Sequence, residues 1–171
     1  MLKEFLTYIK GNKLIKKGDR VLMAVSGGID SMVLADLFLK AGIETGIAHC
    51  NFCLRGREAD KDEMLVKKYA EANNIIFYSK RFDTKRYAAA NGISIQMAAR
   101  ELRFTWFEEI MNEKGFNVTA LAHNLNDNIE TLLINLTRGT GIAGLIGMKP
   151  SAGKIIRPLL FATRNEIEIY S

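Results

Sequence analysis

The stretch Ser26-Gly27-Gly28-Ile29-Asp30-Ser31 decides the fold of this chain. An apolar run over residues 21–25 leads into it, and a second apolar run over 32–35 follows it. This order predicts a buried strand, a tight turn and the first turn of a helix. Amide groups at a helix N-terminus are unpaired and the helix dipole favours anions there, while glycines let the main chain approach closely. We therefore expect Ser26, Gly27, Gly28, Ile29, Asp30 and Ser31 to bind the phosphates of a nucleotide.

The loop differs from the better-known nucleotide loops in what accompanies its glycines. It lacks the Lys-Ser/Thr that ends a Walker A motif, so it offers the phosphates no side-chain cation of its own. The G-x-G-x-x-G pattern is also absent. Since a bare carboxylate repels phosphate, Asp30 is expected to act through Mg²⁺. A simpler interpretation stays open, in which Ser26 or Asp30 only caps a helix and the glycines only form a turn.

Composition indicates one ordinary globular domain. The chain has 171 residues, of which 48% are hydrophobic and 25% charged, which is typical of a protein with a proper core. The first ten residues carry charges among their apolar positions, so they lack a signal peptide's apolar core and we expect a cytoplasmic location without membrane partners. The net charge of +5 permits a polyanionic partner such as RNA but does not require one. Self-association stays open.

Apolar runs alternate with helical patterns along the chain. Strands are expected at 20–25, 44–50, 75–79, 118–122 and 155–157, with helices at 2–15, 32–40, 58–73, 84–91, from Ser94 onward, and at 126–138. This alternation predicts an α/β fold, with a parallel five-stranded sheet and helices on both faces. Ligands of such sheets bind beyond the C-terminal strand ends. Segments 26–31, 49–57 and 123–127 should therefore meet at one edge.

Helical spacing predicts which apolar side chains face the core. The positions expected to be buried are Leu65, Val66, Tyr69 and Ala70 in one helix, Ile95, Ala98, Ala99, Leu102, Trp106 and Ile110 in the long helix, and Ile129, Leu132, Leu133 and Leu136 in the helix at 126–138.

The loop at 26–31 resembles the pyrophosphate loop of the PP-loop ATP pyrophosphatases. The resemblance implies the adenine nucleotide alpha hydrolase-like fold, with a strand order similar to 3-2-1-4-5. Enzymes of this group split ATP between its α and β phosphates and adenylate a substrate carbonyl.

Later segments are similar to the lysidine synthetase branch of that group. His123, Asp127, Glu130 and Thr131 match its His-His-x-x-Asp-Asp-x-x-Glu-Thr motif, whereas Asn124 and Asn126 stand where that family commonly has His and Asp. Further similar blocks lie at 49–56, 98–104, 138–148, 157–160 and 164–167.

The resemblance implies a chemistry and a set of site residues. Lysine would be ligated to C2 of the wobble cytidine of tRNA(Ile) with a CAU anticodon, through an adenylated base, using ATP and Mg²⁺. The catalytic residues would be Asp30, His123, Asp127 and Arg100, and the metal ligands Asp30 and Asp127. Arg103, on the same helix as Arg100, is as compatible with a surface ion pair as with phosphate binding.

Two other functions remain open. The Cys50-x-x-Cys53 pair could handle sulfur in a tRNA 2-thiolation enzyme, or the chain could be a nucleotide-binding module without catalysis. We expect a helical segment at 1–17 followed by a catalytic domain at 18–171. A capping box at Thr163 and Glu166 predicts a final helix, in which Ile167, Ile169 and Tyr170 lack evident partners, so we expect a piece of a longer protein.

Overall fold

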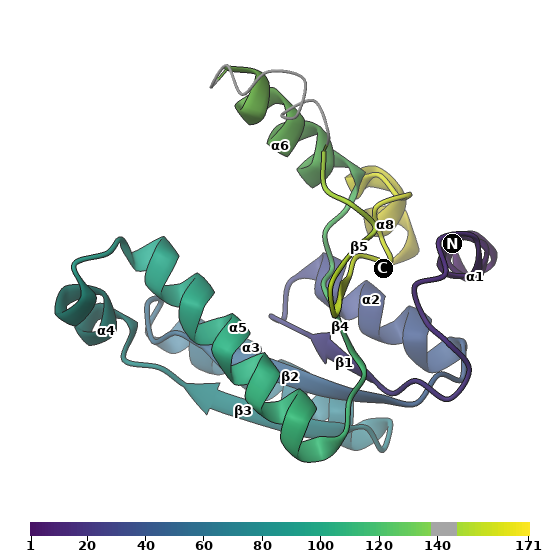
Figure 1. The fold of residues 1–171 in the computed structure, drawn as a ribbon. Coiled ribbons are helices and arrows are strands. Elements are labelled where there is room, and N and C mark those ends of the chain that lie inside the picture. The colour runs from purple at the N-terminus through teal and green to yellow at the C-terminus, as the bar shows by residue number, and fades with distance from the viewer. Residues whose placement is uncertain (138–146) are drawn as a thin grey trace.

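The structure is a computed structural model, which describes residues 1–137 and 147–171. Its strands form one sheet in the order β3-β2-β1-β4-β6-β5 (Figure 1). The first five strands of that order pair in parallel, as the sequence predicts, and β5 pairs antiparallel to β6 at the edge. The two-residue strand β5 was not predicted. The strand bounds are β1 Val21–Ala24, β2 Thr45–Asn51, β3 Ile76–Arg81, β4 Val118–Ala120, β5 Ser151–Ala152 and β6 Ile155–Ile156.

Helices cover both faces of the sheet, which confirms the predicted fold class (Figure 1). Side chains of α1, α2, α3 and α8 share one core cluster with the sheet, and side chains of α5 share the other. The helix bounds are α1 Leu2–Gly11, α2 Ile29–Lys40, α3 Arg57–Ala72, α4 Thr84–Asn91, α5 Ile95–Lys114, α6 Leu125–Thr137 and α8 Arg164–Tyr170.

Strand β1 lies at the centre of the sheet and contributes to both cores. Val21 and Met23 belong to one cluster and Leu22 to the other, because successive side chains of a strand point to opposite faces. All three are fully buried. A central strand covered on both faces fixes the position of the loop that follows it, so the predicted phosphate loop begins at the buried centre of the sheet.

Local signals in the sequence identify several helix ends. The Ser94 side chain accepts a hydrogen bond from the Met97 amide at the start of α5. The predicted capping box of Thr163 and Glu166 is present at the start of α8. Gly92 ends α4 with a left-handed φ of 63°, a conformation that glycine adopts without steric cost.

The predicted burial of α6 is wrong. No residue of this helix is buried in the described chain, and Ile129, Leu133 and Leu136 are 49%, 55% and 50% exposed. The helix projects from the sheet edge beyond the other elements, so its apolar side does not reach the core (Figure 1). Helical spacing shows that a helix has an apolar side but not what lies against it.

Expectations about the packing of four other residues are also wrong. Leu65 and Ile95 are exposed, at the edges of the apolar stripes of α3 and α5. Ile167 is fully buried and joins the core between α8 and α2, although the sequence shows no partner for it. Tyr170 donates a hydrogen bond to Asp36 on α2.

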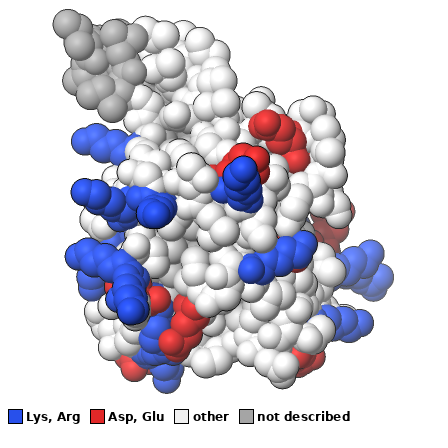
Figure 2. All heavy atoms as spheres, turned by 90° about the vertical axis from the view of Figure 1, so that its right-hand side faces the viewer, with Lys and Arg blue, Asp and Glu red and all other residues white. Residues whose placement is uncertain are grey.

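The surface of the described chain carries mixed charge. On the face around α1 and α8, Lys and Arg side chains are interspersed with Asp and Glu (Figure 2). None of the helices in residues 1–137 and 147–171 is long and apolar enough to cross a membrane.

Candidate functional site

The loop after β1 is held in shape by its two serines. The Ser31 hydroxyl donates to the Gly28 carbonyl at 2.8 Å and accepts from the Ser26 amide at 3.2 Å. The Ser26 hydroxyl accepts from the Gly28 amide at 3.4 Å. Gly28 is the N-cap of α2 and has no side chain that could cap the first turn, so the amides of that turn are available to an anion.

Gly27 adopts a conformation that few other residues could. Its φ is +95°, and a Cβ at this position would lie 3.0 Å from Cβ of Asp62 on α3. A side chain would therefore be strained and would also crowd the neighbouring helix. The positive φ of the backbone and the close packing against α3 therefore both require glycine at position 27.

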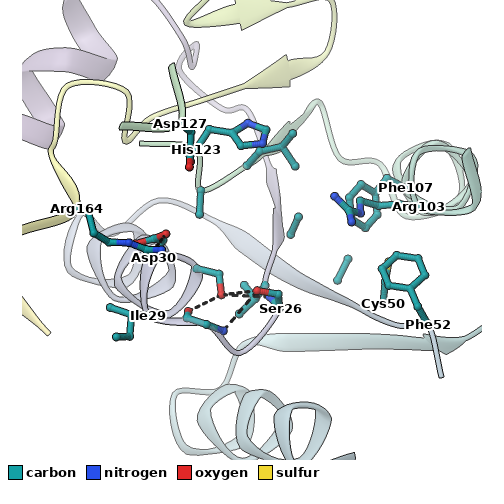
Figure 3. A pocket seen from close by; sticks show the side chains of 17 residues that line it. Ser26, Ile29, Asp30, Cys50, Phe52, Arg103, Phe107, His123, Asp127 and Arg164 are labelled. Atoms are coloured by element: carbon teal, nitrogen blue, oxygen red, sulfur yellow. Dashed lines mark hydrogen bonds and ion pairs between the residues drawn. The ribbon is translucent and has the colours of Figure 1, made fainter. Parts of the chain in front are cut away.

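The loop forms one wall of a cleft of about 410 Å³ at the C-terminal edge of the sheet (Figure 3). Of the predicted site residues, Ser26, Gly28, Ile29, Asp30, Ser31, His123 and Asp127 line this cleft. The segments after β1 and β4 therefore meet, as expected for parallel strands. Residues that the sequence did not single out as site residues also line the cleft, namely Phe52, Phe107 and Arg164.

Asp30 has one paired and one unpaired carboxylate oxygen. Its Oδ2 accepts from Nη1 of Arg164 at 2.5 Å and from the side-chain amide of Asn124 at 3.4 Å. Its Oδ1 is buried without a hydrogen-bond partner among the described residues. A buried carboxylate oxygen without a partner is costly, and a bound cation would satisfy it. The donor set therefore fits Mg²⁺, which binds through one or two carboxylates and phosphate oxygens.

Asp127 takes part in capping helix α6. Its Oδ2 accepts a hydrogen bond from the backbone amide of Asn124, and its own backbone amide donates to Oδ1 of Asn124, both at 3.0 Å. Asp127 thus stabilises the start of α6, and it also lines the cleft. Asn124, which departs from the family motif, is the N-terminal cap of α6, and its side-chain amide donates to Asp30. In the part of the chain that the structure describes, no three His, Cys, Asp or Glu side chains form a metal cluster.

His123 is held as a neutral ring. Nε of Arg157 donates to its Nδ1 at 3.3 Å, and since a guanidinium only donates, the ring proton must be on Nε2. Burial lowers the pKa of His123, and the charge of Arg157 lowers it further. The ring therefore presents a hydrogen-bond donor, and not a positive charge, at neutral pH.

The two arginines of α5 lie in different places. Arg103 lines the cleft, where its guanidinium lies 5.3 Å from the centre of the Phe52 ring. Burial lowers the pKa of Arg103. Arg100, the expected catalytic arginine, is exposed, lies over the Phe104 ring and lines a separate depression beside α4. Arg103, and not Arg100, therefore lines the cleft that contains the loop.

The cysteines and His49 differ in their burial. Burial raises the pKa of the Cys50 thiol to about 12, and Cys53 is exposed. His49 is buried, and its Nδ1 lies 2.8 Å from the Val25 carbonyl. Of the family-like block at residues 138–148, residues 138–146 lie outside the part of the chain that the structure describes.

Comparison with known proteins identifies relatives over the whole chain. The family model of the PP-loop domain matches residues 2–171. A tRNA(Ile)-lysidine synthase of Bacteroides thetaiotaomicron is 46% identical over 96% of this chain, which covers 39% of that relative. A tRNA(Ile)-lysidine synthase of Porphyromonas gingivalis is 49% identical over 96% of the chain, and 37% of it is covered. The chain thus spans less than half the length of these two relatives.

Solved structures with this fold include distant enzymes. A U34-tRNA thiolase, NcsA, from Methanococcus maripaludis has a TM-score of 0.75 at 20% identity, with 98% of this chain and 62% of the thiolase covered. An NH3-dependent NAD synthetase from Campylobacter jejuni has a TM-score of 0.64 at 14% identity, with 98% and 68% covered. These likenesses establish a shared fold. The loop at residues 26–31, the strand order of the sheet and the family match together show that the chain belongs to the PP-loop domain family.

Proposed function

We propose that this chain carries the adenylation site of a tRNA(Ile)-lysidine synthase, which ligates lysine to C2 of the wobble cytidine in a CAU anticodon. One observation carries the proposal: the phosphate loop, Asp30, His123 and Asp127 line a single cleft. The proposal is further supported by identities of 46% and 49% to tRNA(Ile)-lysidine synthases. Residues 18–171 would form the catalytic domain, preceded by the helical segment 1–17.

ATP would lie with its phosphates on the loop at 26–31. The amides of the first turn of α2 would bind phosphate oxygens, and Ser26 and Ser31 keep the loop in the shape that allows this. Asp30 and Asp127 would hold Mg²⁺, which supplies charge neutralisation at the phosphates when bound. The unpaired Oδ1 of Asp30 supports this assignment.

The reaction has two displacements that balance without an outside reagent. The O2 atom of cytidine bonds to the α-phosphorus of ATP, and the bond from that phosphorus to the bridging oxygen breaks, so pyrophosphate leaves. An amine of lysine then bonds to C2 and loses a proton, while the C2–O bond breaks and AMP leaves. His123 would donate from Nε2 to a phosphate oxygen, since its Nδ1 is occupied by Arg157.

The partners follow from the same chemistry. The wobble cytidine lies in a single-stranded loop, so it can be turned out of the anticodon into a cleft. A positive net charge of +5 favours the approach of RNA. Lysine is the second substrate, and the cytoplasm, where tRNA is modified, is the expected location.

Pyrophosphate release tests the proposal. The full-length protein is incubated with Mg²⁺, ATP, L-lysine and a CAU-anticodon transcript of tRNA(Ile), and each component is left out in turn. We expect release that requires the RNA. The matched variant is Asp30→Asn, which keeps the size of the side chain and should lose about ten- to a hundredfold in rate, with circular dichroism unchanged. Release that does not need RNA, or full activity of Asp30→Asn, would contradict the proposal.

A further inference from the structure

The phosphate loop has no cation of its own, yet the fold brings one to it. Arg164 begins helix α8 and lines the same cleft as Ser26, Gly28 and Ser31. Its Nη1 lies 2.5 Å from Oδ2 of Asp30, a residue 134 positions earlier in the chain. The side chains of Arg164 and Asp30 face one another beside the loop (Figure 3).

The start of α8 is fixed while the Arg164 side chain keeps some freedom. The Arg164 amide donates to Oδ1 of Asn126 at 3.0 Å, and the Leu125 amide donates to the Ala162 carbonyl at 2.9 Å. Ile167, one turn further along α8, is fully buried. The Arg164 side chain itself is 49% exposed. A guanidinium on a fixed backbone can therefore turn between neighbouring partners without moving the helix.

Arg164 pairs with Glu168 of its own helix at 4.0 Å and, more closely, with Asp30, the carboxylate expected to meet the metal. Asp30 has one buried oxygen without a partner, so a cation bound there gains an interaction that Arg164 does not provide. A divalent ion at Asp30 would compete with the arginine, because both need the same negative charge. A guanidinium displaced from a carboxylate pairs equally well with phosphate, which also accepts two parallel N–H bonds.

We propose that Arg164 is the phosphate-binding cation of this loop, held on Asp30 until nucleotide and metal enter. It takes the place that a lysine holds in a Walker A motif, but reaches the phosphates from the far end of the chain. The inference rests on the proposed function only in requiring that the cleft binds ATP.

Calorimetric titration of the full-length protein with ATP and with adenosine tests this role in the presence of Mg²⁺. Arg164→Ala should weaken ATP binding by about ten- to a hundredfold, the usual effect of removing a charged hydrogen bond. Its affinity for adenosine should stay within about twofold, since adenosine has no phosphate. Arg164→Lys keeps the charge and should recover part of the loss. Arg86→Ala, at an exposed position of α4, is the matched control and should bind both ligands as the wild type does.

Each outcome distinguishes this inference from the proposed function. If Arg164→Ala binds ATP as tightly as the wild type, the inference is wrong while the proposed function stands. If Arg164→Ala loses adenosine as well as ATP, the arginine only maintains the cleft and the inference is again wrong. If the wild type binds no ATP, both fail. Thermal unfolding of the variant shows whether it is folded, and Arg164→Lys provides the test should the alanine variant unfold.

Discussion

Arg157 and His123 are joined by a hydrogen bond of 3.3 Å in which the guanidinium donates to Nδ1 of the ring. Arg157 is itself anchored through Nη1 to the Lys149 carbonyl at 3.0 Å. The arginine therefore sets both the tautomer and the charge of the histidine. A neutral His123 is suited to donating a hydrogen bond to a phosphate oxygen, because its Nε2 carries the proton.

The titration of His123 follows from this contact. Because burial and Arg157 lower its pKa, NMR should show the ring titrating below its ordinary value of about 6.5. Arg157→Gln removes the nearby charge and should raise that pKa, with burial still holding it down. Because the pKa of His123 is lowered in the wild type, the folded protein binds fewer protons than the unfolded chain. The contribution of His123 to the free energy of unfolding is therefore present above about pH 6.5 and decreases as the pH falls. A pKa at or above 6.5 in the wild type would contradict this account.

Comparing variants of Gly27 and Gly42 distinguishes an effect on the predicted phosphate loop from the effect of backbone strain alone. Both have positive φ, +95° and +65°, but only Gly27 has a neighbour within 4 Å of the added Cβ. Alanine at either position should lower the free energy of unfolding by about 1–2 kcal/mol. Only Gly27→Ala should also weaken ATP binding, because it distorts the predicted phosphate loop. Chemical denaturation and calorimetry of the two variants provide the comparison, and equal ATP affinities would show that the loop does not bind phosphate.

Arg103 and Arg100 provide a second matched pair on one helix. Arg103→Ala should slow pyrophosphate release by about ten- to a hundredfold, because this guanidinium lines the cleft. Arg100→Ala should stay within about twofold at saturating tRNA, since Arg100 is exposed and lies over Phe104. The reverse order of effects would support the expectation drawn from the sequence that Arg100 is catalytic.

The two cysteines distinguish lysidine formation from thiolation. Burial raises the pKa of Cys50 to about 12, so very little thiolate is present at neutral pH. The double variant Cys50→Ser, Cys53→Ser should therefore retain tRNA-dependent pyrophosphate release, with a loss no greater than about threefold. Sulfur transfer to tRNA by the wild type, abolished in the double variant, would support a 2-thiolation enzyme instead.

The fold was largely predictable because its signals are local. The β1 run, the glycine turn and the buried helix after it lie in one continuous stretch, and parallel pairing follows from the alternation of elements. The order of the strands was implied by the family resemblance. The burial of α6 was not predictable, because Ile129 and Leu133 have the same spacing whether or not a partner covers them. Strand β5 has only two residues, too few to give a periodic pattern.

Which residues line the cleft was predictable only where they follow strands. Asp30, His123 and Asp127 come directly after β1 and β4, so the topology brings them to one edge. Arg164 reaches the same cleft from 134 residues beyond Asp30, through the docking of α8 on α2, and nothing in the local sequence indicates that contact. The choice between Arg100 and Arg103 depended on the rotation of α5 against the sheet, which spacing alone does not give.

The central claim is that this cleft uses ATP to adenylate a tRNA base, to which lysine is then ligated. Radiolabelled lysine is the most direct probe, added to full-length protein with Mg²⁺, ATP and tRNA(Ile) bearing a CAU anticodon. We predict label in the RNA at the wobble cytidine, lost when that cytidine is replaced by uridine or ATP is omitted. Folded protein that binds ATP and this tRNA but leaves the RNA unlabelled would contradict the account.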